Sequence, residues 1–332
     1  MRLVKDYMKD DTLRHELNAL TRASFGFDFE SWVANGYFEG DYIPYSFEED
    51  GKILANVSAN IMTFEQNGER RNYIQIGTVM TDINYRNRGL ARKLMEHVLH
   101  EYESKCDGIY LFANLGALDF YRKIGLKEKN QYVYTLKESV RVELQNQSKT
   151  QMDRVELAEA GNVRSDGFRL AAQMDTEGVC NTGVSQVKAE GVSNTGAALA
   201  KQHYMHALKH SVPSGTFDQV NKFALQMFYT ADMENVYYSE KLDCFVVMDI
   251  EDGVLELHSI LSEKEISLEA VIREINLDCK TLKLGFTPKK EDMHLFVAEP
   301  YNGADDYRLF CLGEKLDSIE SEKLYFPTYS HA

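Results

Sequence analysis

The most constraining feature of the sequence is a basic, glycine-containing turn between an expected strand and an expected helix. Residues 73–81 alternate in polarity as a strand does, and apolar residues recur at helical spacing from Leu90 onward. Between them, residues 86–93 contain no acid although the chain has a formal net charge of −15. The cations of this segment are Arg86, Arg88, Arg92 and Lys93. The first turn of a helix has unpaired N–H groups, so the pattern predicts a phosphate site, with a solvated basic helix face as the alternative.

A second pattern follows one helix and one strand later. The next expected helix carries an amide, a small residue and two aromatic rings on one side, at Asn114, Ala117, Phe120 and Tyr121. We interpret Phe120 as a core residue. The Tyr121 phenol, with a reference pKa of about 10, could protonate a departing thiolate whose reference pKa is about 8.5.

Together these two patterns resemble the GNAT acetyltransferase superfamily over roughly residues 1–140. The first is R-x-x-G-x-A, formed by Arg86, Gly89 and Ala91 after a strand, and the second is the N-x-x-A-x-x-F-Y pattern from Asn114 to Tyr121. Each motif alone is permissive, but their order and separation make the pair fairly specific. The resemblance implies an N-acetyltransferase that moves the acetyl group of acetyl-CoA to a primary amine and releases CoA.

The resemblance also implies roles for individual residues. The backbones of Val79 and Thr81 would hold the pantetheine arm, and Met80 or Val79 would donate an N–H to the carbonyl oxygen. Asn114 would orient the cofactor or a water molecule, and Tyr121 would contact the cofactor and act as the general acid. The pyrophosphate would lie on Arg86, Asn87, Arg88, Gly89, Leu90 and Ala91.

The general base is not evident from the strand before the turn. Many members of the superfamily use a glutamate there, and residues 76–81 contain none. The whole chain resembles two-domain acetyltransferases of the enhanced-intracellular-survival type, in which a degenerate acetyltransferase-like domain follows the first. In that group the carboxyl end can reach the catalytic pocket, which makes His331 or the Ala332 carboxylate a candidate base.

Three segments are expected along the chain. An α/β (α+β, mixed-sheet) acetyltransferase domain over residues 1–145 precedes a linker over residues 146–205 and a GNAT-like domain over residues 206–332. In the linker, residues 177–183 recur in similar form as residues 190–196, within a stretch rich in Gly, Ser, Asn and Thr. Such a composition offers little apolar surface to offset the entropy of ordering, so we interpret it as an exposed duplication.

The second half of the chain repeats the order of the first. Hairpin signals stand at residues 67–68 (Asn-Gly) and 252–253 (Asp-Gly). A helix is expected over residues 217–228, with a capping region at residues 214–216. After the second hairpin, residues 262–269 hold three glutamates and no glycine, which is the wrong charge for a pyrophosphate. We expect this half to bind no acetyl-CoA and to shape the acceptor pocket or a subunit contact.

The charge balance bears on partners and location. With 37 basic and 52 acidic residues, the average surface should repel nucleic acid and anionic membranes and should favour a small cationic amine. No stretch has the length and apolarity of a membrane span, and the amino terminus lacks a signal core, which predicts a cytoplasmic protein. The sequence leaves the identity of the acceptor and the oligomeric state open, a homodimer included.

No metal site is expected. The five cysteines are scattered and form no C-x-x-C pair. His203, His206 and His210 fall near one helical face, which we interpret as solvated because no carboxylate or thiol stands nearby in the sequence. The alternative function, from another class, is a non-catalytic acyl-CoA-binding regulatory or sensor protein.

Overall fold

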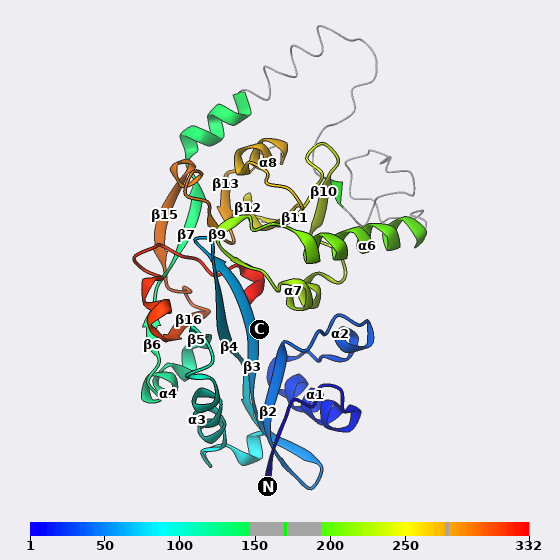
Figure 1. Ribbon diagram of the computed structural model, residues 1–332, viewed down its shortest axis with the longest axis vertical. Coiled ribbons are helices and arrows are strands. Elements are labelled where there is room, and N and C mark those ends of the chain that lie inside the picture. The colour runs from blue at the N-terminus through cyan, green and yellow to red at the C-terminus, as the bar shows by residue number, and fades with distance from the viewer. Residues whose placement is uncertain (147–168, 171–193, 276–278, 332) are drawn as a thin grey trace.

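The computed structural model describes residues 1–146, 169–170, 194–275 and 279–331 (Figure 1). Two β-sheets with helices packed against them form a mixed α/β molecule. Within the described residues, each sheet combines antiparallel pairs with one parallel pair. The expected mixed-sheet α/β class is therefore confirmed. No helix in this part of the chain has the length and apolarity needed to span a membrane.

The first sheet is built on a long hairpin. Strands β3 (Lys52–Gln66) and β4 (Glu69–Thr81) turn at Asn67 and Gly68, whose φ angles of 51° and 81° suit a two-residue hairpin. Strand order is β1-β2-β3-β4-β5-β16-β6, and β9 pairs with the last residues of β3 and with β14. The other strands are β1 (Arg2–Lys5), β2 (Tyr42–Glu49), β5 (Gly108–Asn114), β6 (Lys127–Lys129), β9 (Gly215–Gln219), β14 (Thr287–Pro288) and β16 (Tyr307–Leu312).

The helices of the first half lie to either side of this sheet (Figure 1). Helix α1 (Asp11–Phe25) begins at Asp10, whose carboxylate accepts a hydrogen bond from the Leu13 N–H, and ends at Gly26 in the left-handed conformation. Helix α3 connects β4 to the parallel strand β5. The remaining elements are α2 (Glu30–Ala34), η1 (Ile83–Tyr85), α3 (Leu90–Tyr102), η2 (Leu115–Ala117) and α4 (Leu118–Lys123).

The second sheet repeats the hairpin, helix and parallel strand of the first. Its strand order is β15-β7-β13-β12-β11-β10-β8, and the β11–β12 hairpin turns at Asp252 and Gly253 with φ angles of 51° and 83°. Its strands are β7 (Gln131–Leu136), β8 (Arg169–Leu170), β10 (Val236–Ser239), β11 (Cys244–Glu251), β12 (Val254–Leu261), β13 (Thr281–Leu284) and β15 (Phe296–Tyr301). The accompanying helical elements are α6 (Asn194–His210), α7 (Phe223–Thr230), α8 (Leu268–Glu274), η4 (Met293–Leu295), η5 (Glu314–Ser318) and η6 (Thr328–Ser330).

The two sheets exchange strands. Strand β7, from the end of the first half, pairs with β13 and β15 in the second sheet. Strand β16, near the carboxyl end, pairs with β5 and β6 in the first sheet. Each sheet therefore draws its backbone hydrogen bonds from both halves of the chain. The domain limits near residues 145 and 206 stay a prediction, and the two halves are interlocked across them.

A hydrophobic core is also shared between the halves. Trp32 and Tyr42 of the first half belong to the same buried cluster as Phe223 and Phe245 of the second. The Trp32 indole Nε1 donates a hydrogen bond to the Ala224 carbonyl oxygen at 2.7 Å, which satisfies the buried donor. Helix α7 is thereby fixed against α2.

Residues 194–205, expected in the linker, belong to α6, where Tyr204 is buried. The segment before α7 also differs from its expected structure. The helix expected over residues 217–228 is wrong in its first part, because residues 215–219 form β9 and α7 begins at Phe223. Phe217 stacks on Phe64 of β3 with ring centroids 4.5 Å apart. A short apolar run fits the spacing of a helix and of a strand, and here the pairing with β3 selects the strand. In the duplicated stretch, residues 177–193 lie outside the described residues.

Candidate active site

Strands β4 and β5 separate part-way along their length. They pair in parallel over residues 73–75 and 108–110, and their shared ladder ends there. Residues 76–81 and 111–114 then diverge, and members of both segments line cavities. We call the gap between these two segments the first wedge.

A β-bulge shapes the β4 side of the first wedge. Thr78 and Val79 together stand opposite Val57 alone in the ladder with β3. Thr78 has a φ of 39°, in the left-handed region that strains a β-branched residue. Its hydroxyl forms hydrogen bonds with Ser58 Oγ at 2.6 Å and with the Tyr42 hydroxyl at 2.8 Å. This buried network holds the bulge and interrupts the regular ladder beside the wedge.

The basic turn starts α3 as the sequence predicted. Gly89 precedes the helix with a φ of 74°, and a Cβ added there would meet no atom within 4 Å. No side chain in the described part of the chain caps α3, so its first-turn N–H groups can bind an anion. Arg86 Nε donates to the Thr81 carbonyl oxygen at 3.3 Å, whereas the Arg88 guanidinium lies over the Tyr85 ring at 4.7 Å.

A cavity of about 590 Å³ lies against this turn, and we call it the basic cavity. It is lined by Ser24, Phe25, Val79, Met80, Thr81, Tyr85, Arg86, Asn87, Gly89, Leu90, Ala91, Arg92, Asn114 and Phe120. The structure thus brings most of the expected cofactor contacts to one place. Arg88 and Tyr121 do not line this cavity. Cations and free helix N–H groups without an opposing acid suit a polyanion.

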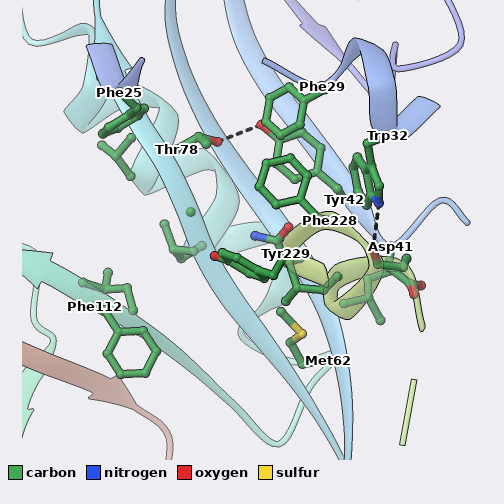
Figure 2. Close-up of a pocket in the computed structure, with 18 of the residues that line it drawn as sticks. Phe25, Phe29, Trp32, Asp41, Tyr42, Met62, Thr78, Phe112, Phe228 and Tyr229 are labelled. Carbon is green, nitrogen blue, oxygen red and sulfur yellow. Dashed lines mark hydrogen bonds between the residues drawn. The ribbon is translucent and has the colours of Figure 1, made fainter. Parts of the chain in front are cut away.

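A second cavity of about 440 Å³ adjoins the first (Figure 2). Phe25, Val79 and Asn114 line both, so the two cavities meet at the bulge. We call it the aromatic cavity, because nine of its lining residues carry aromatic rings: Phe25, Phe27, Phe29, Trp32, Tyr42, Phe112, Tyr121, Phe228 and Tyr229. Its volume falls in the range of small-molecule sites. The second half of the chain supplies part of this wall through α7.

Asn114 and Tyr121, predicted from the second motif, lie beside the bulge. Asn114 ends β5, and Tyr121 projects from α4 into the wall of the aromatic cavity. Tyr121 is buried, and burial raises its pKa to about 12. The phenol therefore keeps its proton at neutral pH and can serve as a proton donor.

The carboxyl-terminal segment packs behind the aromatic cavity. The His331 ring stacks on Phe112 with centroids 3.5 Å apart, and its Nε2 is buried without a hydrogen-bond partner in the described structure. Burial lowers the pKa of this imidazole to about 3, so it is neutral. The Tyr229 hydroxyl donates to the His331 carbonyl oxygen at 2.5 Å. His331 lines neither cavity, its role as a base stays a prediction, and Ala332 lies outside the described residues.

Asp41 is a site residue that the sequence reasoning missed. It is the only acidic residue, within the part of the chain that the structure describes, that lines either cavity. Asn221 Nδ2 donates to its Oδ2 at 3.2 Å, and burial raises the pKa of the carboxyl. In Figure 2 Asp41 lies beside Trp32, across the cavity from Phe25. The dense run of aromatic residues just before it was a signal for this wall.

The corresponding gap in the second sheet is filled by the chain itself. Strand β12 pairs in parallel with β13 over residues 254–257 and 281–284, and His258 is an extra residue in the β11–β12 ladder. The Thr328 N–H donates to the Gly285 carbonyl oxygen at 2.9 Å, and the Thr328 hydroxyl lies 3.2 Å from His258 Nδ1. We call the gap beyond these paired residues the second wedge. The carboxyl-terminal segment occupies it.

The turn after the second hairpin has local ionic partners. Glu263 pairs with His206 at 3.0 Å, and Glu265 pairs with Lys289 at 3.1 Å. His206 is one of the three histidines considered for metal binding. The structure shows no metal-binding group of His, Cys, Asp and Glu side chains among the residues it describes.

Comparisons with known proteins address the two halves differently. Residues 6–126 match the acetyltransferase (GNAT) family. No curated protein matches the chain. A GCN5-related N-acetyltransferase from Kribbella flavida is 17% identical over 93% of this chain and 71% of its own, with a TM-score of 0.49. Eis1 from Mycobacterium abscessus is 13% identical over 93% of this chain and 72% of its own, with a TM-score of 0.47.

Both TM-scores are below 0.5, so these two likenesses carry no argument about the second half. The family match covers the first wedge up to the end of α4, including the bulge, the basic turn, Asn114 and Tyr121. It therefore agrees with the geometry of that region. Over residues 6–126, the part that carries the first wedge, the chain is similar to the acetyltransferase (GNAT) family.

Proposed function

We propose that the protein transfers an acetyl group from acetyl-CoA to the primary amine of a small, cationic acceptor. The observation that carries this proposal is the meeting of two unlike cavities at Val79 and Asn114. One is basic and lies at a helix N-terminus, and the other is aromatic and closed by side chains of both halves. A donor and an acceptor that enter from the two sides would meet at the bulge.

The basic cavity fits the polyanionic part of acetyl-CoA. Gly89 leaves open space where a side chain would otherwise stand, and Arg86, Asn87 and Arg92 line the cavity beside it. A pyrophosphate at this helix start would accept hydrogen bonds from backbone N–H groups. In the proposed complex, the backbones of Val79 and Thr81 hold the pantetheine arm.

The residues at the bulge can support direct transfer. As the amine nitrogen bonds to the acetyl carbon and the carbon–sulfur bond breaks, the N–H of Val79 or Met80 stabilises the charge on the carbonyl oxygen. Tyr121 donates its proton to the leaving sulfur, and Asn114 orients the reacting groups. The amine must attack uncharged, and its nitrogen then loses one proton to a base, for which His331 and Ala332 stay the predicted candidates. Return of one proton from solvent to the Tyr121 phenolate completes the transfer.

A non-catalytic acyl-CoA sensor is the second candidate. It is favoured by the sequence of residues 76–81, which places no carboxylate on β4 beside the wedge. Both candidates require acetyl-CoA binding, and only the enzyme requires transfer. Calorimetry with acetyl-CoA should show binding, and free-thiol release with a panel of amines should show turnover. Binding without thiol release from any amine would favour the sensor, and absence of binding would exclude both.

A further inference from the structure

We propose that the acceptor has two amino groups joined by a flat apolar body, and that Asp41 binds the ammonium group remote from the reacting amine. This inference rests on the proposed function and specifies the acceptor of that same site. Three features of the aromatic cavity carry it: an unpaired carboxylate, an aromatic wall and an acid-free reacting end.

The first feature is a carboxylate without a cation. Asp41 has no salt bridge among the described residues, and the hydrogen bond found for its carboxylate comes from the neutral amide of Asn221 at 3.2 Å. Its neighbour Glu39 is engaged by Lys209 at 2.6 Å. A half-buried carboxylate among aromatic rings has lost part of its hydration, so a cation that binds there recovers electrostatic energy. The repulsion from Glu39 adds to this preference for a positive ligand.

The second feature is the wall between Asp41 and the bulge. Phe29 packs on Tyr42 with centroids 4.8 Å apart, and Trp32 packs edge-on against Phe228 at 5.8 Å. Side chains of this kind give apolar contact area to a flat body and can attract a nearby cation. A sugar with many hydroxyl groups would leave donors and acceptors unpaired against these rings. The wall therefore favours an aryl or short cyclic body.

The third feature is the difference between the two ends of the cavity. Val79, Asn114 and Tyr121 surround the bulge, and none of them is acidic. A nucleophilic amine must be uncharged, and it loses its proton more easily away from a carboxylate. The two cavities meet at Phe25, and Asp41 lies on the opposite side of the aromatic cavity (Figure 2). One end thus tolerates a neutral amine while the other stabilises an ammonium ion.

Two probes of nearly equal shape test this inference. 1,4-Bis(aminomethyl)benzene carries the remote ammonium, and 4-ethylbenzylamine replaces it with a methyl group. Calorimetry in the presence of coenzyme A should show that the diamine binds roughly ten- to hundredfold more tightly, the usual worth of a charged hydrogen bond. Asp41→Asn should abolish this difference while it leaves binding of 4-ethylbenzylamine intact. Glu39→Gln removes a nearby charge that does not line the cavity and should keep most of the difference, because only the added repulsion is lost.

Equal affinities in the wild-type protein, a difference that survives in Asp41→Asn, or no binding of either probe would overturn the inference. The wild-type comparison remains decisive even if the Asp41 variant does not fold. Failure of the proposed function looks different: the diamine would bind with the expected dependence on Asp41, yet no amine would release thiol from acetyl-CoA. Thiol release with other amines, but no preference for the diamine, would reject the inference alone.

Discussion

In both sheets a hairpin strand runs parallel to its neighbour for a few residues, passes a bulge and then separates from it. In the first sheet the bulge includes Thr78, and the gap beyond it opens into two cavities. In the second sheet the bulge is at His258, and the gap receives Thr328 and its neighbours. The same backbone plan thus leaves open cavities in one half and forms a packing contact in the other, depending on what enters the wedge.

The turns that precede α3 and α8 differ in charge and in their partners. The first turn has Gly89 and Arg86 facing a cavity. The second has Glu263 beside the His206 imidazole and Glu265 paired with Lys289. A pyrophosphate at the second turn would meet negative charges where the first presents positive ones. In the second half, a turn of the wrong charge for a pyrophosphate therefore accompanies a filled wedge.

The largest expected effect comes from Tyr121→Phe, which tests whether the open wedge performs chemistry. Removing a general acid should lower kcat by roughly 10²–10³-fold and leave the Kd of acetyl-CoA unchanged, because Tyr121 does not line the basic cavity. Steady-state thiol release and calorimetry measure the two quantities. Tyr329→Phe is the matched control, since that phenol belongs to the filled wedge and accepts a hydrogen bond from Asn235 at 3.1 Å. Equal losses in the two variants would mean that Tyr121 acts through folding alone.

The pH profile sharpens the same assignment. The active form of a general acid is protonated, and burial raises the pKa of Tyr121 to about 12. Activity should therefore show no loss attributable to this residue between pH 7 and 10, because the phenol stays protonated throughout. Measuring kcat across that range checks the expectation. A decline that Tyr121→Phe removes would show that the phenol titrates in this range and has a much lower pKa.

The next effect concerns the basic turn. Gly89→Val places a β-branched residue at a φ of 74° and fills the open side of the basic cavity, so the Kd of acetyl-CoA should rise roughly ten- to hundredfold. Gly253→Val imposes similar strain at a φ of 83° in the second hairpin and should leave this Kd unchanged. Calorimetry on both variants gives the comparison. If Gly253→Val weakens acetyl-CoA binding equally, the loss reflects general destabilisation.

The local parts of this comparison could be predicted from the sequence. Asn67-Gly68 and Asp252-Gly253 specify their hairpins through backbone conformation, and the helical spacing after Gly89 specifies α3. The placement of β7 in the second sheet and of β16 in the first could not be predicted. The choice of a partner strand depends on contacts between residues far apart in sequence. The same reason explains why Phe217 was assigned to a helix before its pairing with Phe64 was known.

The candidate site also contains residues that local motifs predict and residues that only distant contacts bring to it. Gly89, Asn114 and Tyr121 could be proposed from the sequence because they belong to short motifs with fixed spacing. Asp41 was missed because it becomes a cavity residue only when α7, almost two hundred positions later, closes the wall. The filled second wedge was likewise hidden, since nothing local to Thr328 indicates that it packs beside His258.

A smaller effect, on stability, should come from adding a side-chain atom inside the filled second wedge. An alanine Cβ at Gly285 would lie 2.2 Å from Thr328 Oγ1 and 3.0 Å from His258 Cα, so Gly285→Ala should lower the free energy of unfolding by about 1–2 kcal/mol. Adding Thr328→Ala removes the obstructing hydroxyl and should recover part of the loss. Gly116→Ala, whose Cβ would meet only Asn114 Oδ1 at 3.8 Å, is the control. Urea denaturation measures all three variants. An unchanged Gly285→Ala protein would show that Thr328 moves aside freely.

An effect of similar size at most joins the two wedges through His331, which follows the segment in the second wedge and stacks on Phe112 of the first. Burial lowers its pKa to about 3, so between pH 6.5 and 3 the unfolded chain binds more protons at this site than the folded chain. Stability must then fall as the pH drops, by at most about 1.4 kcal/mol per pH unit from this group. His331→Phe keeps the ring stacking and should remove that dependence in urea denaturation at pH 7, 6 and 5.

The same variant decides between support and catalysis at the carboxyl end. A neutral imidazole outside both cavities should affect the aromatic wall through two contacts. Its ring stacks on Phe112, and the Tyr229 hydroxyl donates to the His331 carbonyl oxygen. His331→Phe should therefore change kcat by no more than a few-fold, since that backbone hydrogen bond remains. A loss of 10²-fold or more, the usual worth of a general base, would instead show that His331 reaches the amine during turnover. The carboxyl-terminal segment would then serve the open wedge chemically while it fills the other.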